Sequence, residues 1–268
     1  MMKKRPILTA TLAVLTLAGL PSCINSIVYN GADKNMPDLT YGHSEHATSI
    51  RANDGTVLRG WFFNRGAGTP LVVFYGGNAM NVGNFTSIAA ADPTRSYLLM
   101  NYRGYGGSEG EPSESQIVYD ANTCITHARA EMGTPGPLAL VGYSLGSGVA
   151  TQVAATKSAA ALVLICPFDS MTEVACNQVP FFPRILPMDS WNSAQFAPLV
   201  KCPVTVMRAQ TDDIVPAEST DKLIQAFPTP PAVKTYPADH NSIFASPEFT
   251  ADLMRALPLN QATDVEEI

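Results

Sequence analysis

The sequence is poor in charge, and most of the charge that it has is acidic. Charged residues make up 15% of the 268 residues, with 17 Lys and Arg against 23 Asp and Glu. A nucleic-acid-binding protein needs a basic face, and basic residues run together here only at the extreme N-terminus. A hydrophobic content of 46% excludes wholesale disorder, and a mean hydropathy near zero excludes a protein with many membrane spans. We therefore expect a globular protein, and the length suits one large α/β domain.

Long apolar runs are also lacking, and the longest one is too short to cross a bilayer comfortably. A basic triplet at residues 3–5 precedes a mostly apolar stretch at 7–20, and Pro21 ends it. A basic start followed by an apolar segment of this length is typical of a secretory signal peptide. We therefore expect residues 1–22 to be a signal peptide.

The residues that end this segment indicate lipidation. Leu20-Pro21-Ser22-Cys23 resembles a bacterial lipobox, in which the signal is removed before a cysteine that is then acylated. The two middle positions depart from the usual residues, so ordinary secretion and an uncleaved anchor stay open. We expect a palmitate-type lipid on Cys23 and a tether and lead-in loop at 23–45. The protein would then be a periplasm-facing lipoprotein of the bacterial cell envelope, and Ile24, which is not acidic, favours the outer membrane.

Few cysteines remain for disulfides. Of five in the sequence, four follow Cys23. Cys166 ends one predicted strand and Cys202 precedes the next, which places them at opposite ends of a parallel sheet and makes that pairing unfavourable. A bond between Cys166 and Cys176 stays open, but we favour buried thiols that act as small hydrophobic side chains.

Short apolar runs alternate with helical patterns through most of the chain. Residues 48–52 and 56–64 flank Asn53-Asp54-Gly55, which is a hairpin signal. A hairpin followed by strand–helix alternation predicts an α/β fold with a doubly wound, mostly parallel sheet of about eight strands and helices on both faces. The further predicted strands are 71–75, 97–101, 138–142, 161–166, 204–209 and 233–236, and the predicted helices are 114–132, 144–156, 219–227 and 246–257.

One proline-rich stretch, at about 167–198, interrupts this alternation. We interpret it as a short irregular lid within a domain spanning 46–257, followed by an acidic, frayed tail at 258–268. Its apolar side chains either form a wall for an acyl chain beside the site or pack the insert onto the sheet. These side chains are Phe168, Phe181, Phe182, Ile185, Leu186, Met188, Trp191 and Phe196.

A G-x-S-x-G motif marks the candidate nucleophile. Gly142-Tyr143-Ser144-Leu145-Gly146 lies between a predicted strand and a predicted helix, which is the context of a nucleophile elbow. The alternative is a tight turn whose serine only caps the helix. We favour Ser144 as the nucleophile, because the flanking strand and helix would project its hydroxyl from the end of the sheet.

Chain order then selects the base. A serine hydroxyl needs a base that is oriented by an acid, and in elbows of this kind the order is Ser, acid, His. Three of the four histidines precede Ser144, so His240 is the sole candidate. The loop after strand 204–209 offers Asp212 and Asp213 as the acid, and spacing does not choose between them.

The oxyanion requires backbone donors from two segments. The residue after the nucleophile, Leu145, supplies one N–H group, and the loop after strand 71–75 supplies the other. In that loop we expect Asn78 to be the donor, with Gly77 as the alternative, although the segment could also be a plain turn.

Several strings in the chain resemble the α/β-hydrolase superfamily, specifically its membrane-associated, small-lid serine hydrolases. That group includes acyl-protein thioesterases and monoacylglycerol or lysophospholipid lipases. The resemblance extends from about Thr48 to Met254, and its alignment selects Asp212 as the acid. It departs at Gly76, where the family usually has His, and at Asn101, where it usually has Asp. Besides the elbow it rests on Asn101-Tyr102-Arg103-Gly104-Tyr105-Gly106-Gly107-Ser108, Pro112-Ser113-Glu114, Pro167-Phe168 with Ser170, and Lys201-Cys202-Pro203.

Two charged features have simpler explanations than ligand binding. Arg103 could contact an anionic substrate, but a structural ion pair that holds its glycine-rich loop is favoured. His43 and His46 lie three residues apart in a polar loop with no third ligand in sight, so we expect no metal there.

These observations predict a serine hydrolase that cleaves carboxylic esters or thioesters through an acyl-enzyme. His240 would take the proton of Ser144, Asp212 would stabilise the imidazolium, and the Leu145 and Asn78 amides would hold the oxyanion. We expect no cofactor and no metal, a small or lipid-like acyl substrate, and membrane contact through the N-terminal lipid. A serine peptidase or amidase of the same fold, or an inactive scaffold lipoprotein, is the alternative.

Overall fold

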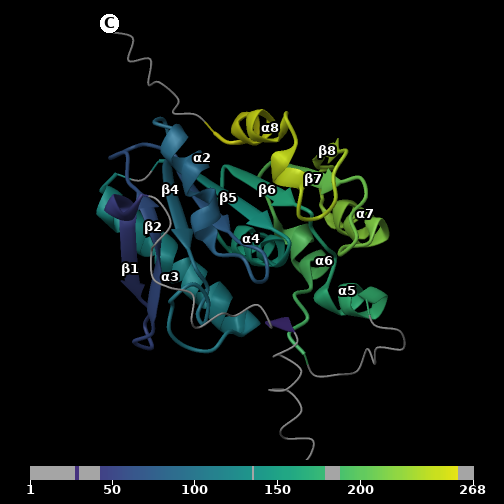
Figure 1. Ribbon diagram of the computed structural model, residues 1–268, viewed down its shortest axis with the longest axis horizontal. Helices are drawn as coiled ribbons and strands as arrows, with labels where there is room; N and C mark the ends of the chain where they lie inside the picture. Colours follow the sequence, from purple (N-terminus) through teal and green to yellow (C-terminus); the bar gives the residue numbers. More distant parts are fainter. Residues whose placement is uncertain (1–27, 30–42, 135, 179–187, 259–268) are drawn as a thin grey trace, which may run out of the picture.

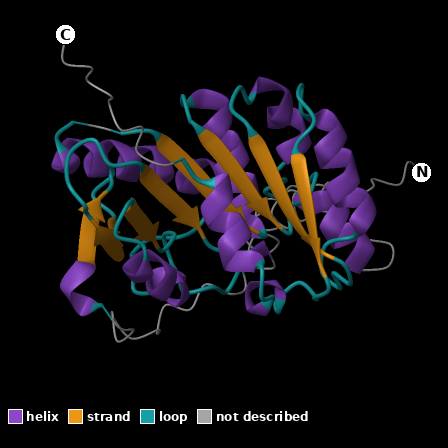
Figure 2. Cartoon of the chain, turned by 90° about the horizontal axis from the view of Figure 1, so that it is seen from above, coloured by secondary structure: helices purple, strands orange, loops and turns teal. Residues whose placement is uncertain are grey.

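The computed structural model describes residues 28–29, 43–134, 136–178 and 188–258, which contain one eight-stranded sheet between two layers of helices (Figure 1; Figure 2). The strand order is β1-β2-β4-β3-β5-β6-β7-β8; β2 runs antiparallel to β1 and β4, and the other neighbours are parallel. The predicted fold is therefore confirmed. The strands are β1 (Ala47–Arg51), β2 (Val57–Phe63), β3 (Leu71–Tyr75), β4 (Ser96–Met100), β5 (Leu138–Tyr143), β6 (Ala161–Ile165), β7 (Val204–Ala209) and β8 (Ala232–Tyr236).

The central strands are apolar on both sides because helices cover both faces of the sheet. Every residue of β3, β4, β5 and β6 is buried, whereas β8, at the edge, is exposed except for Tyr236. Alternate side chains enter two separate cores: Val73 and Leu140 belong to one, and Val72 and Val141 to the other. This arrangement explains why the strands appear in the sequence as continuous apolar runs.

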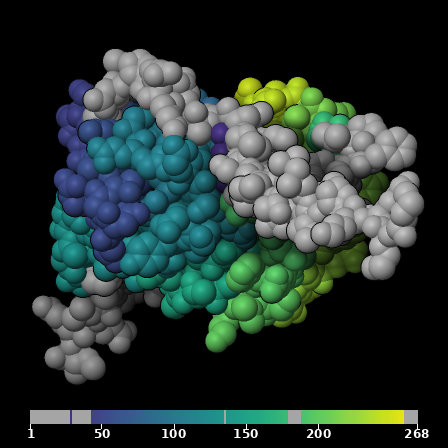
Figure 3. Space-filling model, turned by 90° about the horizontal axis from the view of Figure 1, so that it is seen from below, coloured from purple at the N-terminus to yellow at the C-terminus, as the bar shows by residue number. Residues whose placement is uncertain are grey.

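Each core is closed by its own helices. Ile117, Val149 and Leu223, from α3, α4 and α7, pack into the first core, and Ala89 and Leu253, from α2 and α8, pack into the second. Figure 3 shows the residues of α3, in teal, between the blue N-terminal strands and the green C-terminal half. The helices are α2 (Thr86–Ala91), α3 (Glu114–Met132), α4 (Leu145–Thr156), α7 (Ala217–Ala226) and α8 (Phe249–Ala256).

The insert between β6 and β7 is more regular than the sequence suggested. It contains α5 (Met171–Gln178), α6 (Ser193–Phe196) and the 3-10 turn η3 (Ala197–Leu199), while residues 179–187 lie outside the described part. Phe168 and Trp191 are fully buried against α4. A Cβ at Gly148 would lie 3.1 Å from Cε3 of Trp191, which is tighter than an ordinary contact, so the indole packs directly onto α4 at this glycine. Of the two roles considered for the apolar side chains of the insert, Phe168 and Trp191 therefore pack the insert onto the fold.

The ends of the chain yield one unexpected contact. Val28 and Tyr29, within the predicted tether, are buried in the first core. The predicted signal peptide 1–22, Cys23, most of the tether and tail residues 259–268 lie outside the described residues. In the described part, no helix has the length and apolar character that a membrane span requires.

The described cysteines form no disulfide. Cys124 and Cys166 are buried thiols, and no bond joins Cys166 to Cys176. The favoured expectation of thiols that pack as small hydrophobic groups therefore holds for Cys124 and Cys166.

Candidate active site

Ser144 occupies the tight turn between β5 and α4. Its backbone angles, φ 51° and ψ −117°, lie in a region that residues with a side chain rarely adopt. A Cβ at Gly142 would lie 2.2 Å from the carbonyl oxygen of Gly146, and a Cβ at Gly146 would lie 2.1 Å from that of Tyr75. Both glycines of the motif are therefore required by sterics, and the turn presents Ser144 at the carboxyl end of the parallel strands.

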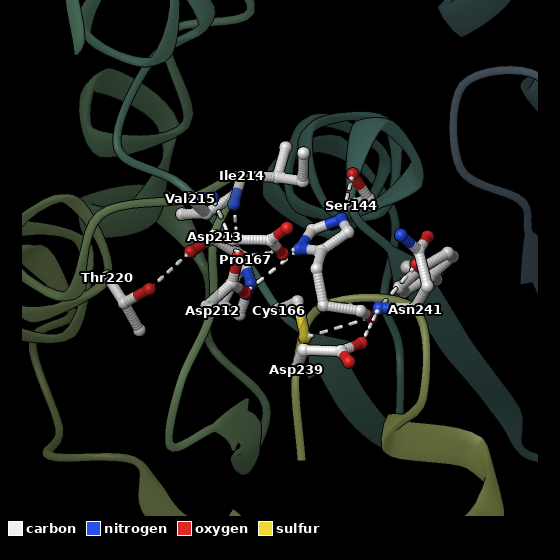
Figure 4. Close-up of polar contacts among 12 residues, drawn as sticks. Ser144, Cys166, Pro167, Asp212, Asp213, Ile214, Val215, Thr220, Asp239 and Asn241 are labelled. Atoms are coloured by element: carbon white, nitrogen blue, oxygen red, sulfur yellow. Dashed lines mark hydrogen bonds and ion pairs between the residues drawn. The ribbon is translucent and has the colours of Figure 1, made fainter. Parts of the chain in front are cut away.

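The loops after β7 and β8 bring an imidazole and a carboxylate to this serine. Nε2 of His240 lies 2.9 Å from Oγ of Ser144, and Nδ1 lies 2.8 and 2.9 Å from the two carboxylate oxygens of Asp212 (Figure 4). The side chains of His240 and Asp212 are 5% and 10% exposed, so their end of this line of hydrogen bonds is largely shielded from water, while Ser144 is half-buried. The three groups have the mutual geometry of a Ser–His–Asp triad.

The structure places Asp212, and not Asp213, beside the imidazole. Oδ1 of Asp212 also accepts hydrogen bonds from the backbone N–H groups of Ile214, at 3.0 Å, and Val215, at 2.7 Å. Burial alone raises the pKa of the Asp212 carboxyl, but the hydrogen bonds from His240 and these amides outweigh it, so the net pKa lies below its ordinary value. Asp213 is exposed, and the turn directs the two neighbouring side chains differently.

The backbone of His240 is held by two groups that the sequence analysis did not assign. The hydroxyl of Tyr143 donates to the His240 carbonyl at 3.0 Å, and Sγ of Cys166 lies 3.9 Å from the same oxygen. Burial raises the pKa of both the Tyr143 hydroxyl and the Cys166 thiol, so both stay protonated donors. Tyr143 is a variable position of the elbow motif, and only the fold shows that it reaches the histidine loop.

Two segments bring backbone N–H groups close to Ser144. Leu145 is the first residue of α4, and the first N–H groups of a helix have no partner within it. Asn78 follows β3 and lines the same cleft as Ser144. A Cβ at the preceding residue, Gly77, would lie 3.4 Å from Cβ of Ser144 and 2.8 Å from Cε1 of Tyr143, so this loop passes very close to the elbow. Both segments that were expected to form the oxyanion hole therefore lie beside the serine.

A cleft of about 700 Å³ opens over Ser144 and His240. Its apolar side comes from the segment after β3 and from the loop after β8, and not from the described residues of the insert at 167–198. Of the two alternatives for the insert, an apolar wall beside the site is wrong for its described aromatic and methionine side chains, because none of them lines the cleft: these are Phe168, Met188, Trp191 and Phe196. Phe181, Phe182, Ile185 and Leu186 lie outside the described residues. The other lining residues are Asn78, Ala79, Met80, Asn84, Phe85, Ile88, Tyr143, Ile214, Asn241, Phe244 and Thr250.

One cluster in the described part of the chain has the spacing of a metal site. Ligand atoms of Cys166, Asp212 and His240 lie within 4.8 Å of one another. Metals bind a thiolate, whereas burial raises the pKa of the Cys166 thiol and disfavours that form. Asp212 and His240 also bind each other directly. The chemistry of the cluster therefore suits a triad better than a metal centre.

Arg103 forms the structural ion pair that the sequence analysis favoured. Its guanidinium donates to both carboxylate oxygens of Asp120, at 2.7 and 2.8 Å, and to Asp54 at 3.1 Å. Asp120, and to a lesser extent Asp54, raise the pKa of Arg103. Arg103 and Asp120 are both buried, so the pair fixes the glycine-rich loop after β4 to α3.

Comparisons with known proteins agree with this architecture. A family profile described as "alpha/beta hydrolase fold" matches residues 69–188. The uncharacterized protein Rv2307c of Mycobacterium tuberculosis is 36% identical over 187 residues, which cover 68% of this chain and 66% of that protein's length. Lysophosphatidylserine lipase ABHD12 of Danio rerio is 31% identical over 178 residues, or 58% of this chain and 46% of the lipase.

Solved structures share the fold at low sequence identity. The alpha-beta hydrolase from Vibrio vulnificus superposes with a TM-score of 0.68 at 18% identity, and the match covers 95% of each chain. The family profile and the eight-stranded sheet agree with this likeness. The chain has the alpha/beta hydrolase fold.

Proposed function

We propose that this protein is a serine hydrolase that cleaves carboxylic esters or thioesters of acyl-chain substrates. The observation that carries the proposal is the partly buried line of hydrogen bonds from Ser144 through His240 to Asp212. The similarity to a protein named as a lipase points to acyl esters in particular.

The geometry supports a two-step reaction through an acyl-enzyme. Nε2 of His240 takes the hydroxyl proton as Oγ of Ser144 forms a bond to the acyl carbon, and Asp212 stabilises the imidazolium. The carbonyl oxygen becomes negative and accepts hydrogen bonds from the N–H groups of Leu145 and Asn78. His240 then gives its proton to the leaving alcohol or thiol as the bond to the leaving group breaks. Water, deprotonated by the same imidazole, then forms a bond to the acyl carbon. His240 returns the proton to Oγ of Ser144 as the acyl–Oγ bond breaks, which releases the acid and restores Ser144.

A substrate panel tests the reaction type. The purified full-length protein is given one acyl group as an ester, a thioester and an amide, with Ser144→Ala and the exposed Ser158→Ala as a matched pair. We expect hydrolysis of the ester and thioester, a loss of kcat of about 10⁶-fold or to background in Ser144→Ala, and full activity in Ser158→Ala. Preferential cleavage of the amide would instead support a peptidase or amidase. No turnover of any compound would support an inactive scaffold.

We also propose that a lipid on Cys23 attaches the protein to a membrane of the bacterial cell envelope, with the outer membrane favoured. Support comes from the signal-like residues 1–22 and the lipobox-like residues before Cys23. Cys23 lies five positions before the buried Val28, so even a fully extended chain keeps their Cα atoms within about 18 Å of each other. The lipid would therefore keep the domain close to the membrane surface.

Fractionation and mass spectrometry test this attachment. We expect the wild-type protein in the membrane fraction with an acylated N-terminal cysteine, and Cys23→Ser in the soluble or unprocessed fraction. An unmodified mature N-terminus after residue 22 would contradict lipidation and support ordinary secretion.

A further inference from the structure

The cleft over Ser144 has a fixed apolar side. Phe85, from the 3-10 turn η2 (Val82–Phe85), stacks on Phe74 of β3 with ring centroids 4.0 Å apart. Phe244, from the 3-10 turn η4 (Ile243–Ala245), also lines the cleft, and its ring packs edge-on against those of Tyr143 and Phe249, with ring centroids 4.8 and 5.0 Å apart. Aromatic pairs of this kind hold their side chains in place. The apolar side is therefore preformed.

We propose that the acyl chain of the substrate lies in this part of the cleft, against Met80, Phe85, Ile88 and Phe244, and that these residues determine which acyl chains are accepted. The inference rests on the proposed hydrolase function and names the substrate subsite. All four residues line the cleft with Ser144, and among the described lining residues only His240 has an acidic or basic side chain. Such a surface suits an uncharged alkyl chain, since a charged chain would lose hydration without gaining a partner.

Bulky substitutions in the cleft test this subsite. Ile88 lies on α2, and Asn84 is an exposed lining residue on η2, so Asn84→Trp adds bulk without replacing a core side chain. Ile88→Trp adds bulk from the apolar side. Leu199→Trp is the control, because Leu199 is 54% exposed and lies outside this cleft. Two series are compared: p-nitrophenyl esters with acyl chains from acetyl to dodecanoyl, and acetate esters of alcohols of rising length.

We expect kcat/KM for the dodecanoyl ester, relative to the acetyl ester, to fall about tenfold or more in both cleft variants. The control variant and the alcohol series should be unchanged. An unchanged acyl series in both cleft variants, or a loss confined to the alcohol series, would overturn the assignment. If the wild-type protein cleaves no ester at all, the proposed function fails, and not this subsite alone.

A second inference comes from the buried pair Val28–Tyr29. The hydroxyl of Tyr29 donates to Oδ2 of Asp189 at 2.6 Å and accepts from Nε1 of Trp191 at 3.1 Å. The same Asp189 oxygen accepts the N–H of Glu114, at the start of α3, at 2.8 Å. Tyr29 is thereby tied to the insert and to a helix of the main fold.

The neighbouring residue connects this anchor to the loop beside the nucleophile. The carbonyl oxygen of Val28 accepts a hydrogen bond from Nδ2 of Asn78 at 2.9 Å. The other end of the Asn78 amide accepts from the Tyr105 hydroxyl, at 2.8 Å, and from the N–H of Ala79, at 3.1 Å. The orientation of the Asn78 loop, whose N–H group is our proposed oxyanion donor, thus depends on a segment some fifty residues earlier in the chain.

We infer that Val28 and Tyr29 are positioning residues of the active site. They hold Asn78 so that its backbone N–H group faces the oxyanion, and they do not touch the reacting atoms. An oxyanion hole acts through donors that are already oriented before the reaction, so a loosened loop lowers kcat while substrate binding in the cleft persists.

Variants of Tyr29 separate positioning from simple stabilisation. Tyr29→Ala removes the anchor, Tyr29→Phe keeps the ring, and Tyr119→Ala removes a tyrosine that is 48% exposed as a control. For each variant, kcat is expressed per active site, and the active sites are counted by titration with a fluorophosphonate. KM, Tm and the Kd of an alkyl boronic acid, which mimics the tetrahedral intermediate, are measured as well. If Tyr29→Ala does not fold, Tyr105→Phe replaces it, because this variant removes only the hydrogen bond from the Tyr105 hydroxyl to Oδ1 of Asn78.

We expect kcat per site to fall about tenfold or more in Tyr29→Ala, with a parallel rise in the boronic acid Kd and little change in KM. Tyr29→Phe should recover part of the loss, and Tyr119→Ala should match the wild type. If Tyr29→Ala, or Tyr105→Phe in its place, lowers Tm but leaves kcat per site and the boronic acid Kd unchanged, the role is purely structural and the inference is wrong.

Discussion

Replacing Asp212 with Asn is the sharpest single-atom change that the site offers. Oδ1 of Asp212 accepts the N–H groups of Ile214 and Val215, and both carboxylate oxygens lie within 2.9 Å of Nδ1 of His240. In the variant, the Asn oxygen would occupy the Oδ1 position, because only an oxygen there can accept the two backbone hydrogen bonds. The NH₂ group would then occupy the Oδ2 position. The NH₂ group can only donate, and at the Oδ2 position it faces Nδ1 at 2.8 Å, slightly closer than the oxygen that remains at 2.9 Å. Its donation to Nδ1 favours the tautomer in which His240 carries its proton on Nε2, facing Ser144 Oγ.

The size of the effect follows from this change of tautomer. An imidazole that carries its proton on Nε2 cannot accept one from Ser144, and the charge that stabilised the imidazolium is lost. In a serine protease the corresponding substitution lowers kcat about 10⁴-fold, which corresponds to about 5.4 kcal/mol at 1.36 kcal/mol per factor of ten. We expect a loss of the same order here. The thermal stability should change little, because the two backbone hydrogen bonds are kept.

The assay compares Asp212→Asn with Asp213→Asn, which differ by one position and have the same change in charge. Ester hydrolysis is measured as kcat, with the concentration of folded protein taken from circular dichroism and absorbance. Asp213→Asn should keep most of the wild-type activity, since its side chain is exposed. A loss below tenfold in Asp212→Asn, or a larger loss in Asp213→Asn, would refute the assignment of the acid.

Further predictions concern the frame around the site. Gly146→Ala places a methyl group 2.1 Å from the Tyr75 carbonyl oxygen, so we expect a loss of about 1–3 kcal/mol or more in urea unfolding, or no folded protein; wild-type stability would contradict the steric role of this glycine. Asp120→Asn leaves Arg103 buried without its main partner, and should cost about 3–5 kcal/mol while kcat per titrated site stays normal; a selective loss of kcat would instead tie Arg103 to the substrate. Burial raises the pKa of Asp92, but its hydrogen bonds to neighbouring side chains outweigh this and hold it at about 2. Its stabilising effect is present above pH of about 4 and disappears as the pH falls toward 2, so the urea midpoint of Asp92→Asn should vary less over that range than that of the wild type.

The sequence predicted the fold well because a parallel sheet covered on both faces produces continuous apolar runs. It also predicted that Ser144 and His240 would meet, since the chain order of the elbow fold left one histidine. Spacing in the sequence did not distinguish Asp212 from Asp213 as the acid. The geometry of the turn decides which side chain faces the imidazole, and the hydrogen bonds from the N–H groups of Ile214 and Val215 to Asp212 fix that geometry.

Other features had no periodic signal to reveal them. Helix α2 has only six residues, too few to show a helical period in the sequence, so the sequence does not indicate that Ile88 lines the cleft. The aromatic residues of the insert were more conspicuous, yet Trp191 packs in the core. Val28 and Tyr29 follow Ile27 in a mostly polar segment, and an apolar run this short has no period from which burial could be predicted. Their contacts depend on side chains that are remote in sequence.

Labelling with a fluorophosphonate probe, followed by intact-mass measurement and peptide mapping, shows whether Ser144 is an activated nucleophile. We expect one adduct per chain, located on Ser144, no adduct in Ser144→Ala, and much slower labelling in His240→Ala. A folded wild-type protein that does not react near neutral pH, or a Ser144→Ala variant that reacts as fast as the wild type, would contradict this assignment.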